Sequence, residues 1–389
     1  MDTLAHSLLS KLLSAGEMCN AGRRSRQAAL TESPLAEYRG FSSLPKKESF
    51  EETMRAARAE GAVELVWDGK KSGEGFIKRI NLVDRRKLAA FLGIRLSEDK
   101  VDEAREHLQP FVTDYPVLEE VIDRWKKLRK VRSLGPEKYQ DWMDAIRTIV
   151  VCQNAASTQT MSLPVRKFSS QLFKDSKRIE KLIGPLDVLL VGGLDSDIRP
   201  EAGVLQELGL FREEHPARLA GNVIVERERV TACLDQPYSG LPAQTVLRLA
   251  STPSMVMTIE NLTTFHSEAR QRCDENVLLI YTAGMPSPAW RAMYRRLLGS
   301  LSNDVPVYHW GDVDEGGFRI AATLASDANS VGYKLLPWKM HPDDVPKNVR
   351  RKATPHTLAQ IRYFSAVAGW SELGDAISEA EFVVEQESL

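Results

Sequence analysis

The sequence contains little cysteine and has no long apolar run. Its four cysteines lie far apart along 389 residues and form no C-x-x-C pair. We therefore expect buried or incidental thiols, not a zinc site or a disulfide framework. No apolar stretch approaches the length of a membrane span, and the first 13 residues lack the basic start and unbroken apolar core of a secretory signal. These absences predict a cytoplasmic protein with no membrane partner.

An excess of charge of either sign is also absent. The chain has 52 Lys and Arg against 53 Asp and Glu, which gives a net charge of −1. A nucleic-acid-binding protein can still segregate its charges, so local clusters are more informative than the sum. The hydrophobic fraction of 43% and the charged fraction of 27% are those of a globular protein. A chain of this length exceeds one ordinary core, so we expect two or three domains.

Residues 1–95 are predicted to form a winged-helix-like arm. Leucines at helical spacing indicate an amphipathic helix within residues 1–30, and Ser49 to Glu60 indicates a capped helix. Two strand-like runs, 63–67 and 76–82, then flank a glycine-containing turn with Lys70 and Lys71. Helix, strand, turn and strand follow each other in this order in a winged-helix module, although an ordinary surface hairpin gives the same pattern.

Residues 96–136 are predicted to form a basic helical linker. The chain is charged and helical in character from Asp84 to Arg132, and its last nine residues include six basic side chains and no acidic one. Such a run is usually a solvated helix face, and in a nucleic-acid-binding protein it becomes a candidate for phosphate contacts. Gly135 and Pro136 break the pattern, so we place a domain boundary there.

Residues 137–250 are predicted to form a second small domain of helices and short strands, which suits a winged-helix fold. In this domain Asp175 or Ser176 can cap a helix whose first turn carries Lys177 and Arg178. Basic residues at that position oppose the helix dipole at a cost of up to about 1 kcal/mol. They therefore suggest a contact with a phosphate backbone, and an exposed basic turn without a function is the alternative.

Residues 251–389 give the clearest pattern. Apolar strand-like runs at 255–260, 277–284, 305–310 and 332–338 alternate with helical segments at 287–301 and 316–324. Strands that alternate with helices predict a parallel sheet with crossover helices. This third region is therefore predicted to be an α/β domain.

Carboxylates follow two of these strand-like runs. Glu260 ends the first run, and Asp312 and Asp314 follow the third. The carboxyl ends of parallel strands meet at one edge of a sheet, and clustered carboxylates repel one another unless a cation such as Mg²⁺ or Mn²⁺ is bound. The pattern predicts metal-dependent phosphodiester chemistry, in which Glu260 is a ligand or a general base. Helix capping by Asp314 and a small-molecule phosphatase of the haloacid-dehalogenase type are alternatives.

Two groups of motifs resemble a known family. The first resembles the toprim domain of the nuclease subunit JetD of Wadjet anti-plasmid systems, which is related to the topoisomerase VI A subunit and the meiotic double-strand-break protein. It consists of Glu260-Asn261-Leu262-Thr263-Thr264-Phe265, Trp310-Gly311-Asp312-Val313-Asp314 and Gly317-Phe318. The second resembles the winged-helix region before that domain, and consists of Phe168-Ser169, Leu172-Phe173 and Asp175-Ser176-Lys177-Arg178. Together they span roughly residues 160–325.

This resemblance implies a fold and a function. It implies an α/β toprim domain at 251–389, a parallel sheet flanked by helices, preceded by α+β winged-helix-type domains of which 137–250 is a CAP-like DNA-binding domain. Glu260, Asp312 and Asp314 would bind Mg²⁺ or Mn²⁺. The substrate would be double-stranded plasmid DNA, and the partners a second copy of the chain, an SMC-type ATPase, its kleisin and an accessory winged-helix subunit. Glu315-Gly316 departs from the Thr-His pair often found in this family.

A further departure concerns tyrosine. Topoisomerase VI A-like proteins attack DNA with a tyrosine a few residues before a Leu-Phe pair, where this chain has Arg166 and Lys167. Without that nucleophile, hydrolysis by metal-activated water is favoured, and Arg166, Lys167, Lys177 and Arg178 become candidate DNA contacts. The sequence thus predicts a metal-dependent DNA endonuclease. A tyrosine transesterase that uses Tyr139 or Tyr38, and a non-catalytic DNA-binding subunit, remain alternatives.

Overall fold

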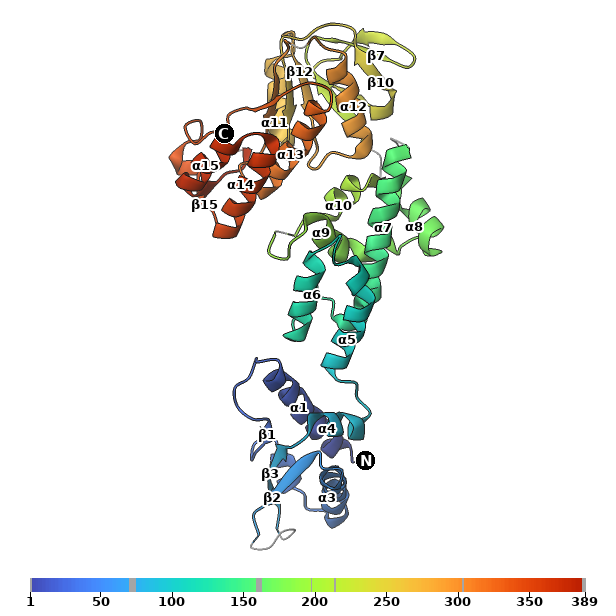
Figure 1. Ribbon diagram of the computed structural model, residues 1–389, viewed down its shortest axis with the longest axis vertical. Coiled ribbons are helices and arrows are strands. Elements are labelled where there is room, and N and C mark those ends of the chain that lie inside the picture. Colours follow the sequence, from blue (N-terminus) through green and yellow to red (C-terminus); the bar gives the residue numbers. More distant parts are fainter. Residues whose placement is uncertain are drawn as a thin grey trace. The chain divides into compact units, whose positions relative to one another are not determined.

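The computed structural model describes residues 2–69, 75–158, 163–196, 198–212, 215–302 and 304–386. The chain divides into two compact units (Figure 1). The first consists of Met1–Met143 with Gly192–Leu194, and the second of Asp144–Val191 with Asp195–Leu389. Among the described residues, no helix combines the length and the apolar character that a membrane crossing requires.

The first unit has a core that is built from helices and a β-hairpin. Its antiparallel sheet has the order β1-β3-β2. The strands and helices that build this core are β1 (Ala29–Leu30), β2 (Val63–Trp67), β3 (Ile77–Leu82), α1 (Thr3–Asn20), α2 (Ala36–Arg39), α3 (Leu44–Ala59) and α4 (Arg85–Leu92). The predicted amphipathic helix is confirmed as α1, because its leucines at positions 8, 9, 12 and 13 are buried. Helix α3 begins at Leu44, so the predicted start at Ser49 is wrong; Pro45 in its first turn is compatible with this earlier start.

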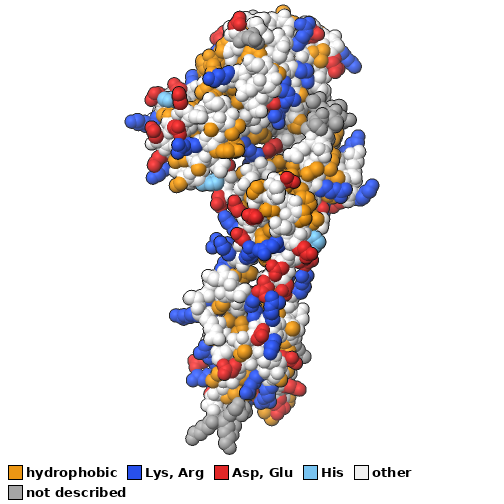
Figure 2. Space-filling view, viewed as in Figure 1, with side chains coloured by type: hydrophobic (Ala, Val, Ile, Leu, Met, Phe, Trp, Pro, Cys, Tyr) orange, Lys and Arg blue, Asp and Glu red, His pale blue; other side chains and the backbone are white. Residues whose placement is uncertain are grey.

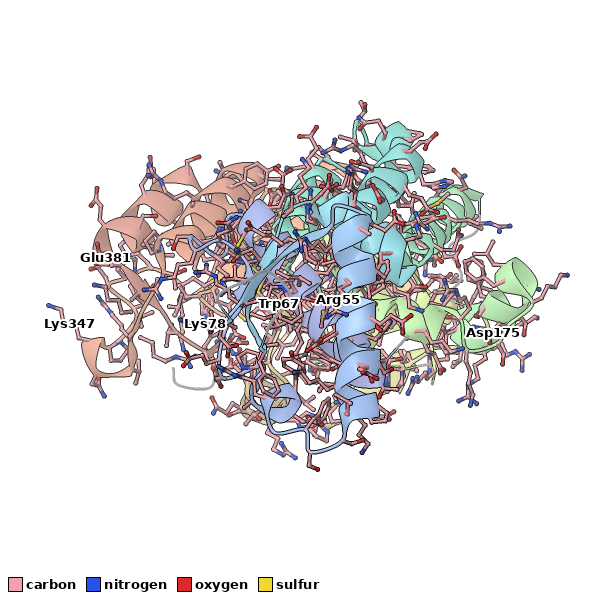
Figure 3. The ribbon with its side chains drawn as sticks, turned by 90° about the horizontal axis from the view of Figure 1, so that it is seen from below. Arg55, Trp67, Lys78, Asp175, Lys347 and Glu381 are labelled. Atoms are coloured by element: carbon pink, nitrogen blue, oxygen red, sulfur yellow. The ribbon has the colours of Figure 1, made fainter. Side chains whose placement is uncertain are left out.

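The predicted hairpin is present as β2 and β3. Figure 3 shows Arg55 of α3 beside Trp67 at the end of β2, and the guanidinium carbon lies 5.4 Å from the indole centroid. Lys78 and Arg79 of β3 are exposed, as a basic hairpin requires. The predicted turn residues Lys70 and Lys71 lie outside the described residues.

The predicted helical character from Asp84 to Arg132 is confirmed up to Lys126, but most of the basic run that follows is not helical. After α4 the chain forms separate helices: α5 (Ser97–Leu108), η1 (Gln109–Phe111), α6 (Val117–Lys126) and η2 (Pro136–Lys138). Gly93 ends α4 in a left-handed conformation, and Leu128 and Arg132 adopt φ angles of 53° and 46°. These angles are incompatible with a right-handed helix, so most of the basic run lies in a loop after α6.

The helical part of the second unit follows. Its elements, of which the first begins in the preceding unit, are α7 (Tyr139–Thr158), β4 (Leu163–Pro164), α8 (Val165–Phe173), η3 (Ile179–Leu182), α9 (Ile183–Val191), α10 (Glu201–Glu207) and β5 (Leu210–Phe211). β4 and β5 pair in parallel. The predicted helix start at Lys177 is displaced, because the 3₁₀ turn η3 begins at Ile179 and Lys177 and Arg178 lie in the turn before it.

A six-stranded sheet forms the centre of the second unit. Its order is β14-β13-β11-β12-β6-β9. The strands are β6 (Ala217–Ala220), β9 (Ser239–Leu241), β11 (Val256–Ile259), β12 (Leu278–Tyr281), β13 (Val307–Trp310) and β14 (Leu335–Pro337). The last four are parallel, as predicted, and β6 and β9 are antiparallel. The sheet therefore begins before residue 251, because two of its strands lie in the stretch 137–250 that the sequence assigned to the preceding domain.

Helices cover both faces of this sheet (Figure 1). Val256 and Leu278 pack in one core with α12 and α13, whereas Met257 and Leu279 pack in another with α11. Strands buried on both faces read as continuous apolar runs, which is why the sequence revealed them. The other elements are β7 (Ile224–Arg227), β8 (Thr231–Cys233), η4 (Ala243–Thr245), β10 (Val246–Leu249), α11 (Leu262–Gln271), α12 (Pro288–Gly299), α13 (Glu315–Asn329), η5 (Lys347–Val349), β15 (Arg351–Lys352), α14 (Pro355–Ala368), α15 (Ser371–Ala380) and β16 (Phe382–Val383).

Candidate functional site

The structure brings Glu260 next to the loop that carries Asp312 and Asp314. Ile259 of β11 pairs with Trp310 of the neighbouring strand β13, so the residues that follow both strands leave the sheet at the same edge. The Glu260 amide continues the ladder and donates to the Trp310 carbonyl at 3.0 Å. In return, the Asp312 amide donates to Glu260 Oε2 at 3.2 Å. Strand register therefore fixes this pair of carboxylates.

The three carboxylates interact electrostatically. Burial is the main cause that raises the pKa of Glu260 to about 8, and the negative charges of Asp312 and Asp314 raise it further. The hydrogen bond from the Asp312 amide acts in the opposite direction. Glu260 therefore holds its proton at neutral pH when no cation is nearby. A divalent cation would favour the ionised form of all three groups.

Two glycines allow the chain to pass close to these acids. A Cβ atom at Gly311 would lie 2.7 Å from His309 Nε2 and 2.9 Å from Glu260 Oε2. A Cβ atom at Gly317 would lie 2.2 Å from the backbone oxygen of Asp312. A side chain at either position would therefore displace the acidic loop.

Asp314 also begins helix α13. Its Oδ1 accepts a hydrogen bond from the Gly317 amide at 2.8 Å, which is the geometry of an N-cap. The helix-capping alternative is thus confirmed as a structural role for this residue. Capping holds one carboxylate oxygen near the start of the helix and is compatible with a second role for the side chain.

The end of the chain ties both acidic loops together. Val313 and Val384 form an isolated bridge with backbone hydrogen bonds of 2.9 and 3.1 Å. The Gln386 amide donates to Asp312 Oδ1, and its side-chain Oε1 accepts from the Asn261 amide at 2.8 Å. Sequence reasoning missed Gln386, because nothing in the local sequence marks a residue so far from the motifs as their partner.

A buried histidine lies behind Glu260. The Thr258 hydroxyl donates to the Tyr308 carbonyl at 3.2 Å and is hydrogen-bonded with His309 Nδ1 at 2.9 Å. His309 Nε2 has no hydrogen-bond partner among the described residues. Burial lowers the pKa of His309 to about 3, so the ring is neutral. His309 therefore adds no charge beside the acidic loop.

The acids suit a hard cation by their chemistry, but their side chains do not converge in this conformation. They supply only oxygen donors, which Mg²⁺ and Mn²⁺ prefer. Within the described ranges, no three His, Cys, Asp or Glu side chains are arranged so that together they could hold one ion. An ion would require the carboxylates to turn toward each other, and it would relieve the repulsion that raises the pKa of Glu260.

The predicted DNA contacts lie on α8 and the turn after it. Arg166 and Lys167 are exposed on the first turn of α8, and Arg166 also lies 3.3 Å from Glu180. Lys177 is exposed in the turn that carries Asp175, a residue labelled in Figure 3. Arg178 differs, because its guanidinium forms an ion pair with Asp144 of α7 at 2.6 Å. Three of the four side chains are therefore open to a ligand, and the fourth fixes the turn.

Charge does not segregate on the face shown in Figure 2. Blue and red side chains are interspersed there. This agrees with the balanced net charge of −1. This face therefore carries no extended basic surface.

A cavity of about 490 Å³ lies beside the acidic loop. Asp314 and the first turn of α13 form one wall, and β15, the first turn of α14 and β16 form the others. We call it the Asp314 cavity. Its basic residues are Arg199, Arg319, Arg351 and Lys352. None of the four was predicted as a site residue, because they come from three separate segments of the chain.

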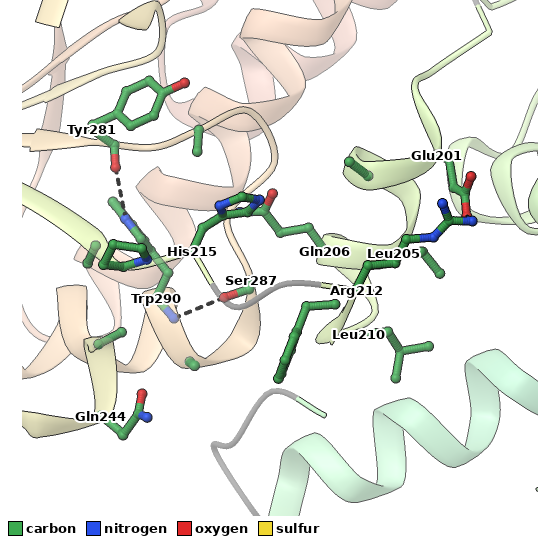
Figure 4. A pocket seen from close by; sticks show the side chains of 17 residues that line it. Glu201, Leu205, Gln206, Leu210, Arg212, His215, Gln244, Tyr281, Ser287 and Trp290 are labelled. Atoms are coloured by element: carbon green, nitrogen blue, oxygen red, sulfur yellow. Dashed lines mark hydrogen bonds and ion pairs between the residues drawn. The ribbon is translucent and has the colours of Figure 1, made fainter. Parts of the chain in front are cut away.

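A second pocket, of about 450 Å³, contains none of the predicted site residues (Figure 4). It lies between α10 and the start of α12. The Trp290 indole donates to the Tyr281 carbonyl at 3.0 Å, and its amide donates to Ser287 Oγ. Arg212 forms an ion pair with Glu201 at 2.6 Å. Several of its polar groups are therefore already paired.

Part of the chain is similar to a known family. Residues 209–362 match the family model described as Wadjet protein JetD, C-terminal. Wadjet protein JetD of Bacillus cereus (strain Q1) is 31% identical over 166 residues, which are 41% of this chain and 40% of that relative. The three acids fall within the family match, and the α8 segment lies outside it. Over residues 209–362 the chain is therefore similar to the C-terminal part of Wadjet protein JetD, the family that its motifs around Glu260 and Asp312 resemble.

Proposed function

We propose that this protein is the nuclease subunit of a Wadjet-type complex that defends a cell against plasmids. In this proposal it is a metal-dependent endonuclease that hydrolyses double-stranded, closed-circular DNA. The observation that carries the proposal is the position of Glu260, because burial and two neighbouring aspartates raise its pKa to about 8 inside the segment that matches JetD. An acidic cluster that is unfavourable without a cation is what a metal-dependent phosphodiesterase requires.

The proposed fold of the metal-binding part is a toprim domain. Its basis is the parallel order β14-β13-β11-β12, with acids after the carboxyl ends of β11 and β13. The α+β segments before it are proposed to be winged-helix-type domains, and the segment with α8 to be the DNA-binding one. Helices and short strands are found both before and after residue 144, where the second unit begins, and this mixture supports the assignment.

The proposed ligands of the cation are Glu260, Asp312 and Asp314. Bound Mg²⁺ or Mn²⁺ would neutralise the phosphate and lower the pKa of an attacking water. The protein's own contribution is to hold the acids: β11 and β13 fix Glu260 and Asp312 in register, and Gln386 ties both loops. Gly311 and Gly317 leave room for this arrangement.

The proposed DNA contacts outside the metal centre are Arg166, Lys167 and Lys177, with Arg178 in a supporting position. The exposure of the first three supports a role at the phosphate backbone. Helix α8 carries no tyrosine, so hydrolysis is favoured over a covalent tyrosine intermediate. A second copy of the chain, an SMC-type ATPase, its kleisin and an accessory winged-helix subunit are the proposed partners.

The test is cleavage of closed-circular DNA by the reconstituted complex with Mn²⁺, with wild-type protein compared with Glu260→Ala. We expect the substitution to abolish cleavage and plasmid protection and to leave DNA binding intact. Protection that persists with Glu260→Ala would contradict a nuclease role and favour a docking subunit. A protein-linked 5′ end on gels run without protease treatment would contradict hydrolysis and indicate a tyrosine transesterase.

A further inference from the structure

The Asp314 cavity contains two kinds of basic residue. Arg199 and Arg319 lie deep and are held in place: Arg199 pairs with Asp187 at 2.7 Å and with Glu207 at 2.6 Å, and Arg319 pairs with the same glutamate at 2.7 Å. Even so, Arg199 Nη2 is buried and has no partner among the described residues. The charges of these two arginines are thus balanced by Asp187 and Glu207, and one buried donor is left unused.

Arg351 and Lys352 of β15 lie at the mouth of the same cavity. Their side chains are 63% and 83% exposed, and they pair with Glu385 and Glu381, the second pair at 3.8 Å. Exposed ion pairs of this kind contribute little to stability, so either cation can exchange its partner for a phosphate at little cost. Arginine and lysine are also the usual phosphate ligands of DNA-binding proteins.

The start of helix α14 also faces this cavity. Thr354 caps the helix by accepting a hydrogen bond from the Thr357 amide at 3.1 Å, and both threonines line the cavity. The 14-residue helix adds the positive end of its dipole at this position. The threonine hydroxyls and the helix dipole therefore favour a bound anion, as the two cations do.

The cavity also contains carboxylates, and their positions restrict where an anion can bind. Asp314 belongs to the proposed metal centre, and Glu315 accepts a hydrogen bond from the Ser196 hydroxyl at 2.8 Å. Glu385 is the partner of Arg351. An anion therefore fits on the β15 and α14 side, where Arg351, Lys352 and Thr354 meet.

We propose that the Asp314 cavity binds the backbone phosphate that neighbours the cleaved phosphate on the same DNA strand, through Arg351, Lys352 and the start of α14. This inference rests on the proposed function, which places the cleaved phosphate at Glu260, Asp312 and Asp314. Successive phosphates of one strand advance about 3.4 Å along the helix axis. Because Asp314 forms a wall of the cavity, a neighbouring phosphate can enter it while the cleaved one is at the metal.

The test is the salt dependence of binding to a short DNA duplex, measured by fluorescence anisotropy with EDTA and the full-length protein. The double substitution Arg351→Gln and Lys352→Gln should weaken binding and lower the slope of log K against log salt by about one, since both side chains contact the same phosphate and each phosphate contact contributes about one. The control is Arg362→Gln, because Arg362 is 61% exposed and pairs with Asp375 at 2.8 Å but does not line the cavity. It should leave the slope unchanged.

Two further measurements separate this inference from the proposed function. Mn²⁺ binding should be unchanged in the double variant and lost in Glu260→Ala, whose duplex affinity should stay at the wild-type value. A double variant with the wild-type affinity and slope would overturn the proposal, as would wild-type protein that binds no duplex. Pyrophosphate is titrated as a second ligand. A double variant that loses pyrophosphate binding but binds the duplex like wild type would also overturn the proposal, because the cavity would then bind a free phosphate compound.

Discussion

Glu260 makes stability depend on pH in a direction that can be tested. Its pKa is raised from 4.5 to about 8, mainly by burial, so the folded protein keeps a proton that the unfolded chain releases. Folding stability therefore falls as the pH rises from about 4.5 to about 8. Glu260→Gln cannot ionise, so in EDTA we expect its melting temperature to exceed that of wild type above pH 8, by about 2–4 °C or more, and the difference to vanish near pH 5.

The exposed Glu379 provides the control for this prediction. Glu379→Gln keeps Glu260, so its melting temperature should follow that of wild type over the whole pH range. Added Mn²⁺ at pH 8 should raise the melting temperature of wild type and leave that of Glu260→Gln unchanged. The same Mn²⁺ shift in both proteins would show that Glu260 is not a ligand.

Gly311→Ala tests how closely the chain packs around the acids. The new Cβ atom would lie 2.9 Å from Glu260 Oε2 and would push the carboxylate out of position. Outer residues that orient metal ligands typically change metal affinity by about 10–100-fold, and we expect a loss in this range by Mn²⁺ titration calorimetry. Gly299→Ala in α12 is the control, because nothing lies within 4 Å of its new Cβ atom. It should leave Mn²⁺ affinity unchanged, and an unchanged affinity for Gly311→Ala as well would contradict the predicted packing.

Sequence alone identified the acids and missed the residues that support them. Glu260, Asp312 and Asp314 were recognisable because each follows an apolar run that had to be a buried strand. His309 lies inside such a run, and its role depends on a contact with Thr258 of a neighbouring strand. A contact between strands is set by register, which a local pattern does not encode.

At the scale of elements, the segment after β16 acts as a clamp on the acidic loops. Gln386→Ala removes the acceptor of the partly buried Asn261 amide, and the loss of one such hydrogen bond costs about 0.5–1.5 kcal/mol. We expect the loop after β11 to loosen and Mn²⁺ affinity to fall, while far-ultraviolet circular dichroism stays unchanged. Gln271→Ala on the exposed side of α11 is the matched control. Equal Mn²⁺ affinities for the two variants would show that Gln386 does not support the metal centre.

Helices and strands could be predicted where the local sequence pattern matches their place in the fold. The parallel strands β11 to β14 are buried on both faces, so their apolar runs were visible in the sequence. Strands β6 and β9 are short and join the sheet by antiparallel pairing, which only the folded chain reveals. The basic run after α6 was misassigned because Leu128 and Arg132 adopt left-handed angles that are rare for residues other than glycine.

At the scale of the whole molecule, the two units have separate hydrophobic cores. One core lies within residues 5–96, and the cores around the central sheet lie within residues 217–384. Every contact described for the acidic loops is made inside the second unit. The metal centre should therefore not need the first unit in order to form.

A fragment that begins at Asp144 tests this separation. We expect it to unfold cooperatively and to show the same Mn²⁺-induced rise in melting temperature as the full chain, because β11, β13 and Gln386 are all retained. In cells that carry the rest of the defence system, we expect the fragment to lose plasmid protection, since it lacks the basic run 124–132, which is a candidate for phosphate contacts. A fragment that folds but fails to respond to Mn²⁺ would show that the first unit helps to shape the metal centre. A fragment that still protects against plasmids would instead show that residues 1–143 are dispensable for defence.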